Sequence, residues 1–275
     1  MKASLRRRKL AVLGAGKMGG ILLDAFLERG LVTPADVRAT VRHAERAREV
    51  TRQYKVHCGT DNRAAVKGAN IVLICVKPQG VEEVLEEIGP EMTKDKIAIS
   101  IAASVPTYYV EERLAAEVPV IRAMPNTPAS VGCGMTALVP GKFAKPEHMT
   151  VAHVLFDAVG RTVAVEEKQM DAVTGLSASG PAFLYIILES MAEAGVKVGL
   201  SRDLATLLAS QTMLGAATVA LDSGHHPALL KDMVTTPAGC TIDGILELEE
   251  GKVRVTLIKA IVKATERARE LLMAK

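Results

Sequence analysis

Apolar and polar positions along the chain change their spacing near residue 166. Before that point, short apolar runs typical of buried strands alternate with segments of helical spacing. Alternating strands and helices build a parallel sheet with helices on both faces, so we expect an α/β fold with a doubly wound sheet over residues 1–166. The predicted strands lie at residues 9–13, 37–41, 56–57, 71–76, 97–101, 135–139 and 162–165, with another from residue 120; helices are expected at residues 44–53, after residue 62 and at residues 146–159.

After residue 166 the apolar spacing is helical throughout. Residues 181–188 lead one predicted helix, residues 204–221 form a second, and residues 253–275 form an amphipathic last helix. We therefore predict a second, all-α domain over residues 167–275.

Residues 204–221 contain no charged side chain and are long enough to span a membrane. Thr206, Ser210 and Gln211 interrupt the apolar surface, and we expect no other comparable segment. A helix that is apolar on all sides in a soluble chain is enclosed by other helices, and one small domain cannot enclose it alone. The pattern predicts a tightly interwound homodimer through this region, and no membrane segment.

Charge gives little support to nucleic-acid binding. The net charge is +3, and basic residues are interleaved with acidic ones. The one basic run, at residues 2–9, is expected to be a solvated lead-in to the first strand. Gly14 and Gly16 interrupt the apolar residues after it, so no signal peptide is predicted.

The four cysteines are far apart in the sequence. They form no Cys-x-x-Cys pair and have no nearby histidine at metal-ligand spacing. Neither a disulfide framework nor a metal site is predicted, and a cytoplasmic location fits best. These cysteines are Cys58, Cys75, Cys133 and Cys240.

A glycine-rich turn joins the first predicted strand to the first helix. Its sequence is Gly14-Ala15-Gly16-Lys17-Met18-Gly19. Between a strand and a helix this pattern indicates a Rossmann-like dinucleotide-binding unit, because the glycines allow a tight turn and a close approach of a pyrophosphate to the helix N-terminus.

The second strand is expected to carry the residue that contacts the adenosine ribose. An acidic residue there favours NAD by accepting a bond from the free 2′-hydroxyl, but here Thr40 and Val41 are followed by Arg42. Because a cation suits a 2′-phosphate, the sequence favours NADPH. The alternative is that Arg42 is an ordinary exposed arginine.

Two further strands end where ligands bind in open parallel sheets. The run at residues 71–76 leads into Lys77-Pro78-Gln79, where a helix is expected to start. The run at residues 97–101 leads into Ala102-Ala103-Ser104, whose small side chains let a flat ring approach the backbone.

A turn of small residues is expected to open a helix late in the chain. Thr236 is predicted as the N-cap and Pro237 as a first-turn proline, followed by Ala238-Gly239-Cys240-Thr241. The free N–H groups of such a helix start suit a small anion such as a carboxylate, and Thr241 adds a hydroxyl. The alternative is an ordinary buried helix start.

Ser179 precedes Gly180 and Pro181 at the expected start of another apolar helix. Its hydroxyl and the neighbouring amides are a second candidate for binding an anionic substrate, with a simple helix cap as the alternative. The Gly-x-Ser-x-Gly pattern of a nucleophile elbow is missing, so a hydrolase is not indicated.

Together these motifs closely resemble the pyrroline-5-carboxylate reductase family over nearly the whole chain. The matching stretches are residues 14–19, 76–78, 171–182 and 230–242. The resemblance implies a two-domain enzyme that reduces 1-pyrroline-5-carboxylate to L-proline, the last step of proline synthesis, with NADPH as donor and NADH often accepted. It also implies dimers that can assemble further into decamers.

The resemblance assigns site residues by position. Gly239, Cys240 and Thr241 would hold the substrate, with Thr241 as the catalytic residue at the imine nitrogen. Ala238 and Cys240 depart from the family, where glycine and alanine or threonine are common at these positions. Besides the glycine turn, and Arg42 near the 2′-phosphate, the cofactor groove would be lined by Asn62, Cys75, Val76, Lys77, Pro78, Ala102 and Ala103.

The chemistry would be governed by positioning, since hydride must pass between two rings stacked at about 3–3.5 Å. A threonine hydroxyl is a poor acid, so we expect the substrate to react largely as a protonated iminium oriented by Thr241. The nearest alternative is a 3-hydroxyacid dehydrogenase, but residues 181–193 lack the lysine that this chemistry needs. A dinucleotide sensor without turnover is a second alternative, against which the intact Thr241 argues.

Overall fold

The computed structural model describes residues 8–114 and 117–273. Most of the basic run at residues 2–9 and the last two residues of the predicted final helix lie outside the described residues. The chain forms two compact units. The first contains the described residues up to Ala178 together with those from Ala264 onward, and the second is Ser179–Lys263.

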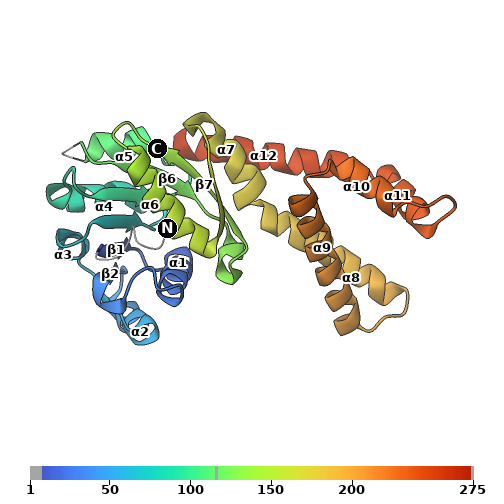
Figure 1. The fold of residues 1–275 in the computed structure, drawn as a ribbon, viewed down its shortest axis with the longest axis horizontal. Helices are drawn as coiled ribbons and strands as arrows, with labels where there is room; N and C mark the ends of the chain where they lie inside the picture. The colour runs from blue at the N-terminus through green and yellow to red at the C-terminus, as the bar shows by residue number, and fades with distance from the viewer. Residues whose placement is uncertain (1–7, 115–116, 274–275) are drawn as a thin grey trace. The chain divides into compact units, whose positions relative to one another are not determined.

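An eight-stranded sheet forms the centre of the first unit (Figure 1). Its strands are β1 Leu10–Leu13, β2 Val37–Thr40, β3 His57–Gly59, β4 Ile71–Ile74, β5 Ile97–Ser100, β6 Val120–Met124, β7 Gly134–Pro140 and β8 Gly160–Ala164. They lie in the order β3-β2-β1-β4-β5-β6-β7-β8, and β1 to β6 are parallel. β7 pairs antiparallel with β6 and parallel with β8. The strand order reverses direction between β1 and β4, and ligands bind at such a switch point.

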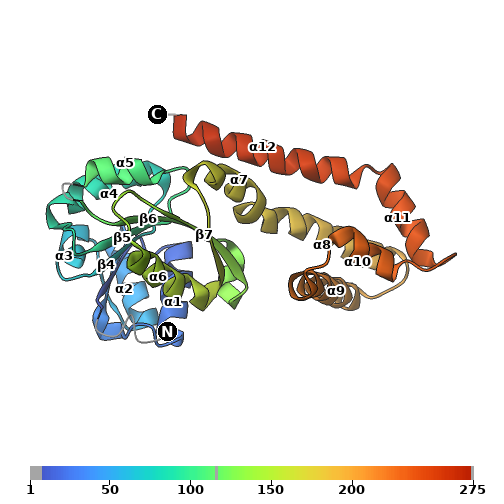
Figure 2. The ribbon, with the colours of Figure 1, turned by 45° about the horizontal axis from the view of Figure 1, so that its top comes forward.

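Helices cover both faces of this sheet (Figure 2). They are α1 Lys17–Glu28, α2 Ala44–Tyr54, α3 Asn62–Lys67, α4 Val81–Ile88, α5 Thr107–Arg113 and α6 Pro146–Phe156. Successive strand side chains point to opposite faces. In β1, Leu10 and Val12 belong to a core with α1, α2 and α6, whereas Ala11 and Leu13 belong to a core with α3, α4 and α5. The predicted doubly wound sheet is thus confirmed.

The second unit is helical and leaves large apolar side chains exposed. It contains α8 Gly180–Lys197, α9 Arg202–Ser223, α10 Pro227–Val234, α11 Cys240–Glu250 and the first part of α12 Val253–Met273. α8 packs closely on α9 at Gly195, where an added Cβ would lie 2.7 Å from the Cβ of Ala205. Ile186 of α8 and Leu207 of α9 are nevertheless 63% and 64% exposed in the single chain. Exposed apolar surface of this extent marks an interaction site.

Two helical stretches are long and apolar enough to cross a membrane, by length and composition. They are Glu167–Lys197 and Arg202–Ser223, and 6% and 11% of their apolar windows are buried. The expectation that residues 204–221 have no comparable counterpart is therefore wrong. The expectation failed because residues 167–180 are also largely helical, and together with α8 they form a second long apolar stretch.

The compact units divide the chain differently from the predicted boundary after residue 166. Residues 167–178 belong to the first unit, where they form the 3-10 turn Glu167–Gln169, helix α7 Met170–Val173 and the π-helical segment Thr174–Ala178. The end of α12 also belongs to this unit. The helical region is continuous in sequence but is shared between the two units.

Candidate functional site

The glycine turn between β1 and α1 is built from close backbone contacts. Gly14 has a left-handed φ of 89°, and the N–H groups of Gly14 and Ala15 donate to the carbonyl of Thr40 at 3.0 and 2.8 Å. A Cβ on Gly19 would lie 2.5 Å from the carbonyl oxygen of Gly14, so only glycine lets the helix start this close to the turn. Gly16 is the N-cap of α1, and no described side chain caps the helix. Its first N–H groups are therefore open to an anion.

The predicted cofactor residues all lie at the carboxyl ends of β1 to β5. Arg42 follows β2 and is exposed, and Asn62 opens α3 after β3. Because these strands are neighbours in the sheet, their loops meet along one edge. The residues that follow β4 and β5 at this edge are Cys75, Val76, Lys77, Pro78, Ala102 and Ala103.

Asn62 is held by hydrogen bonds on both sides. The hydroxyl of Thr40 donates to its Oδ1 at 2.6 Å, and its Nδ2 donates to the Glu87 carboxylate at 2.7 Å. Its backbone N–H also donates to Glu87, at 3.1 Å. These bonds fix the start of α3 against the end of β2, next to the glycine turn.

The chain leaves β4 directly against the glycine turn. A Cβ on Gly14 would lie 3.0 Å from Cγ1 of Val76 and 3.1 Å from the carbonyl of Cys75. Burial raises the pKa of the Cys75 thiol, which is therefore neutral at physiological pH. A neutral side chain adds no repulsion where a pyrophosphate would approach. The strand predicted to reach residue 76 ends at Ile74.

The loop between β5 and α5 carries the small residues Ala102 and Ala103. The N–H of Ala102 donates to Oγ of Ser100 at 3.3 Å. Ser104 is buried, has a left-handed φ of 59°, and donates from its hydroxyl to the carbonyl of Ala268 in α12 at 2.9 Å. The loop is thus fixed to a helix from the far end of the chain.

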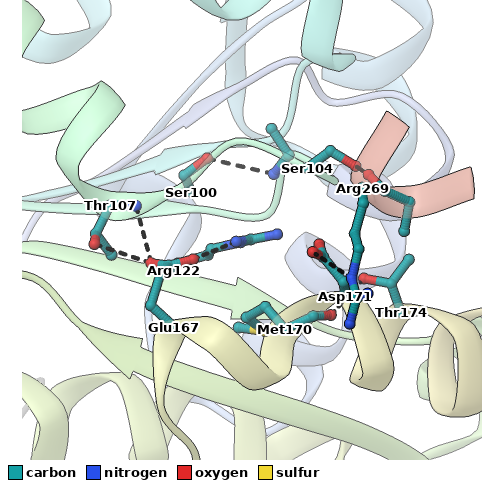
Figure 3. A network of polar contacts seen from close by, with 11 residues as sticks. Ser100, Ser104, Thr107, Arg122, Glu167, Met170, Asp171, Thr174 and Arg269 are labelled. Carbon is teal, nitrogen blue, oxygen red and sulfur yellow. Dashed lines mark hydrogen bonds and ion pairs between the residues drawn. The ribbon is translucent and has the colours of Figure 1, made fainter. Parts of the chain in front are cut away.

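β6 carries a buried charge to which the sequence pattern assigned no role. Arg122 is 4% exposed, and its Nη1 donates to the carboxylate of Glu167 (Figure 3). The other oxygen of Glu167 accepts from the N–H and the hydroxyl of Thr107 at 3.0 and 2.9 Å. Glu167 therefore neutralises Arg122 and also caps the N-terminus of α5. The signal in the sequence was a charged residue inside an apolar strand.

Asn126 joins the loop after β6 to the π-helical segment. Its Oδ1 accepts from the N–H of Met135 at 2.9 Å, and its Nδ2 donates to the carbonyl of Ser177 at 3.2 Å. Pro181 has no N–H to donate to this carbonyl, which lies four residues before it. Asn126 supplies a bond in its place to this partly buried carbonyl.

The predicted helix start at Ser179, Gly180 and Pro181 is confirmed, because α8 begins at Gly180 with Ser179 as its N-cap residue. Ser179 has helical φ and ψ of −85° and −26° and lies between the π-helical segment and α8. Its side chain caps no described N–H group. Asn126 satisfies the carbonyl of Ser177, which Pro181 leaves without a helical donor, where the π-helical segment meets α8.

The predicted helix start at Thr236 and Pro237 is wrong, because α11 begins at Cys240 with Gly239 as its N-cap. Residues 236–239 form a tight turn in which the N–H of Gly239 donates to the carbonyl of Thr236 at 3.0 Å. Ala238 has a φ of 57°, as the third residue of a type II turn does. The Thr-Pro pair therefore opens a turn rather than a helix.

The corrected helix start still brings the predicted groups together. A Cβ on Gly239 would lie 2.4 Å from Oγ1 of Thr236, so the turn can pack this closely only with glycine. Cys240 is exposed, Thr241 is half-buried, and no described side chain caps the helix. Open N–H groups and the Thr241 hydroxyl thus share one helical turn. Within the described residues, no cluster of histidine, cysteine or acidic side chains could hold a metal ion.

Comparisons with known proteins cover both halves of the chain. A family model described as pyrroline-5-carboxylate reductase dimerisation matches residues 167–271. A second, described as NADP oxidoreductase coenzyme F420-dependent, matches residues 9–104. The pyrroline-5-carboxylate reductase of Methanosarcina acetivorans is 42% identical, over 97% of this chain and 99% of the relative. That of Arabidopsis thaliana is 40% identical, over 96% of this chain and 95% of the relative.

Solved structures agree with the sequence relatives. The pyrroline-5-carboxylate reductase of Coxiella burnetii superposes with a TM-score of 0.88 at 34% identity, covering 96% of this chain and 98% of that one. The Plasmodium falciparum pyrroline carboxylate reductase, solved with NADP bound, has a TM-score of 0.88 at 27% identity, covering 98% and 99%. The chain belongs to the pyrroline-5-carboxylate reductases, the oxidoreductases that catalyse the last step of proline biosynthesis.

Proposed function

We propose that the chain binds NADPH at the carboxyl edge of its sheet and reduces 1-pyrroline-5-carboxylate to L-proline with Thr241 as the catalytic residue. The observation that carries the cofactor assignment is the glycine turn: Gly14 and Gly19 leave no room for a Cβ, and the start of α1 is uncapped by described side chains. When bound, the nicotinamide supplies the hydride. The pyrophosphate would lie on the N–H groups that follow Gly16.

The substrate would be held at the start of α11. Its carboxylate suits the open N–H groups behind Gly239 and Cys240, where the helix dipole favours an anion. The Thr241 hydroxyl, in the same helical turn, would bond to the ring nitrogen. Because a threonine hydroxyl is a poor acid, we propose that it orients a substrate already protonated as an iminium or relays a proton from water. We also propose Ser179, the N-cap residue of α8, as a second group that binds the substrate, since its hydroxyl caps no described N–H group.

Replacing Thr241 by alanine tests the catalytic assignment. We expect turnover to fall roughly 10²-fold, the usual scale of a positioned proton-transfer group, with little change in the dissociation constant for NADPH. The assay follows NADPH oxidation with pyrroline-5-carboxylate as substrate. Thr256→Ala is a matched control, since the hydroxyl of this exposed threonine on α12 donates to the carbonyl of Lys252, directly before the helix. Wild-type turnover in Thr241→Ala would remove Thr241 from this role.

We propose NADPH rather than NADH as the preferred donor. Arg42 follows β2 and makes no ion pair with a described residue, so its charge is available for a 2′-phosphate. The match to an NADP oxidoreductase model supports the same choice. Comparing kcat/KM for the two donors on the wild-type enzyme tests it, and equal values would contradict it.

We propose that the chain is an interwound homodimer that can assemble further into a decamer. The match to a dimerisation model and the exposed apolar side chains of α8 and α9 support a partner chain as their cover. We therefore favour neither a membrane nor a nucleic acid as partner. We also propose a cytoplasmic location, which four free cysteines support. Light scattering of protein purified without detergent tests the assembly.

A further inference from the structure

The end of α12 is bound to the loop that carries Ala102 and Ala103. The Ser104 hydroxyl donates to the carbonyl of Ala268, and the two residues are 4% and 3% exposed. Figure 3 shows the Ser104 side chain pointing to the last turns of this helix. The bond joins residues 164 positions apart in the sequence and is shielded from water. It therefore constrains the loop more than a surface hydrogen bond would.

The backbone of Ser104 lies in a conformation that residues with a side chain adopt at a cost. Its φ is 59°, a value that glycine reaches without strain. Strained residues persist where the surrounding structure fixes them, and they cluster where ligands bind. Serine at this position keeps the hydroxyl that reaches Ala268, which a glycine would lack.

The last turns of α12 are themselves fixed. Nε of Arg269 lies 3.7 Å from Oδ2 of Asp171, which belongs to α7 (Figure 3). α7 follows the 3-10 turn that begins at Glu167, and the Glu167 carboxylate accepts from Thr107, the residue directly after this loop. The middle of the loop after β5 and the residue at its far end therefore bond to helical residues that follow the sheet in the sequence.

We propose that Ser104 is a positioning residue for the cofactor. Its bond to Ala268 holds the loop at residues 101–106 in the conformation that receives the nicotinamide half of NADPH. Ser104 would act through Ala102 and Ala103 and need not touch the cofactor. This inference rests on the proposed cofactor site at the carboxyl edge of the sheet.

Two substitutions separate the hydrogen bond from the backbone strain. Ser104→Ala removes the hydroxyl and keeps the strain, whereas Ser104→Gly removes both. We expect each to raise the dissociation constant for NADPH about fivefold, the usual effect of one lost hydrogen bond. The KM for NADPH should rise similarly, and the KM for pyrroline-5-carboxylate should not change. NADPH titration followed by fluorescence, without substrate, measures the binding.

A second measurement tests how well the loop is held in place. Hydrogen exchange of the amides at residues 101–105, on protein without ligand, should be faster in both variants than in wild type. Thr150→Ala is the control, since it removes an exposed hydroxyl that bonds to the carbonyl of Pro146 within α6. It should leave both the exchange and the NADPH affinity unchanged.

The outcomes are distinguishable. If Ser104→Gly binds NADPH as tightly as wild type, the hydrogen bond does not position the cofactor and the inference is refuted. Faster exchange over the whole first unit, rather than at residues 101–105, would show a general structural role and refute it as well. A wild-type protein that does not bind NADPH would instead refute the proposed cofactor site, whatever the variants do.

Discussion

Removing the carboxylate of Glu167 should destabilise the protein far more than removing an ordinary surface charge. In Glu167→Ala, the guanidinium of Arg122 would stay in a site where it is 4% exposed, without the carboxylate that neutralises it. Taking away one partner of a buried ion pair costs about 3–5 kcal/mol. The N–H of Thr107 at the start of α5 would also lose its acceptor, which costs about 1 kcal/mol.

These two costs overlap, because one carboxylate makes both contacts. The Glu167 side chain is 31% exposed, so water can reach the vacated place and reduce the penalty. We therefore expect the free energy of unfolding to fall by about 3 kcal/mol, at the lower end of the range for buried pairs. Glu167→Gln keeps an oxygen for Thr107 but loses the charge. Its free energy of unfolding should lie between those of the wild type and Glu167→Ala.

Urea unfolding at one fixed protein concentration measures this loss, since the stability of an oligomer depends on protomer concentration. Glu49→Ala is the matched control. Glu49 pairs with Arg46 on the surface, where the two side chains are 60% and 46% exposed, so its loss should cost less than about 1 kcal/mol. If Glu167→Ala is no less stable than Glu49→Ala, the reasoning from the buried charge of Arg122 is wrong.

Two further predictions concern stability. Ala238→Gly should raise the free energy of unfolding by about 0.5 kcal/mol, because relief of the left-handed strain at a φ of 57° outweighs the added freedom of glycine in the unfolded chain; a lower urea midpoint would contradict this. The pKa of His148 is lowered, chiefly by desolvation, and its Nδ1 accepts from the N–H of Lys145 at 2.9 Å. The unfolded state therefore binds the proton more tightly than the folded state. Neutral His148 contributes to the stability of the fold above about pH 6.5, and this contribution is lost as the pH falls through the lower folded pKa. His148→Gln should flatten the dependence of the melting temperature on pH over this range, and an unchanged slope would refute the assignment.

The architecture of the first unit was predictable because its signals are local. A strand, a glycine turn and a helix follow one another at Gly14–Gly19, and the spacing of apolar residues gives each later strand. Strand ends were less predictable. Cys75 and Val76 are as apolar as the strand before them, but they pack against Gly14, which belongs to another segment. Only the folded chain shows this contact.

The long-range polar contacts could not be predicted from the sequence, because each joins residues far apart along the chain. Pro181 predicts a helix start, since proline cannot donate to the preceding turn. α8 does begin there, and the carbonyl of Ser177 that Pro181 leaves without a donor is bonded by Asn126, 51 residues before Ser177. Glu167 likewise lies 45 residues from Arg122. A single sequence shows that Arg122 needs a partner but not which residue provides it.

At residue 236 the signals were local but ambiguous. Thr236 and Pro237 fit an N-cap and a first-turn proline, and they fit the first two positions of a type II turn equally well. Glycine at position 238 would have indicated the turn, because the third residue of a type II turn favours glycine. Alanine stands there instead, in a left-handed backbone conformation that strains it, so the sequence did not indicate the turn.

The glycines of the first turn have different physical reasons, and the difference bears on the cofactor. Gly14 and Gly19 are required by the protein itself, since a Cβ on either would meet neighbouring atoms at 3.0 Å or less. Gly16 has a negative φ of −81°, and nothing lies within 4 Å of the place where its Cβ would stand. The fold therefore does not explain the missing side chain at Gly16. The space it leaves adjoins the uncapped start of α1, where a pyrophosphate must come close to the backbone. Gly16 is thus the glycine whose absence of a side chain is best explained by a ligand.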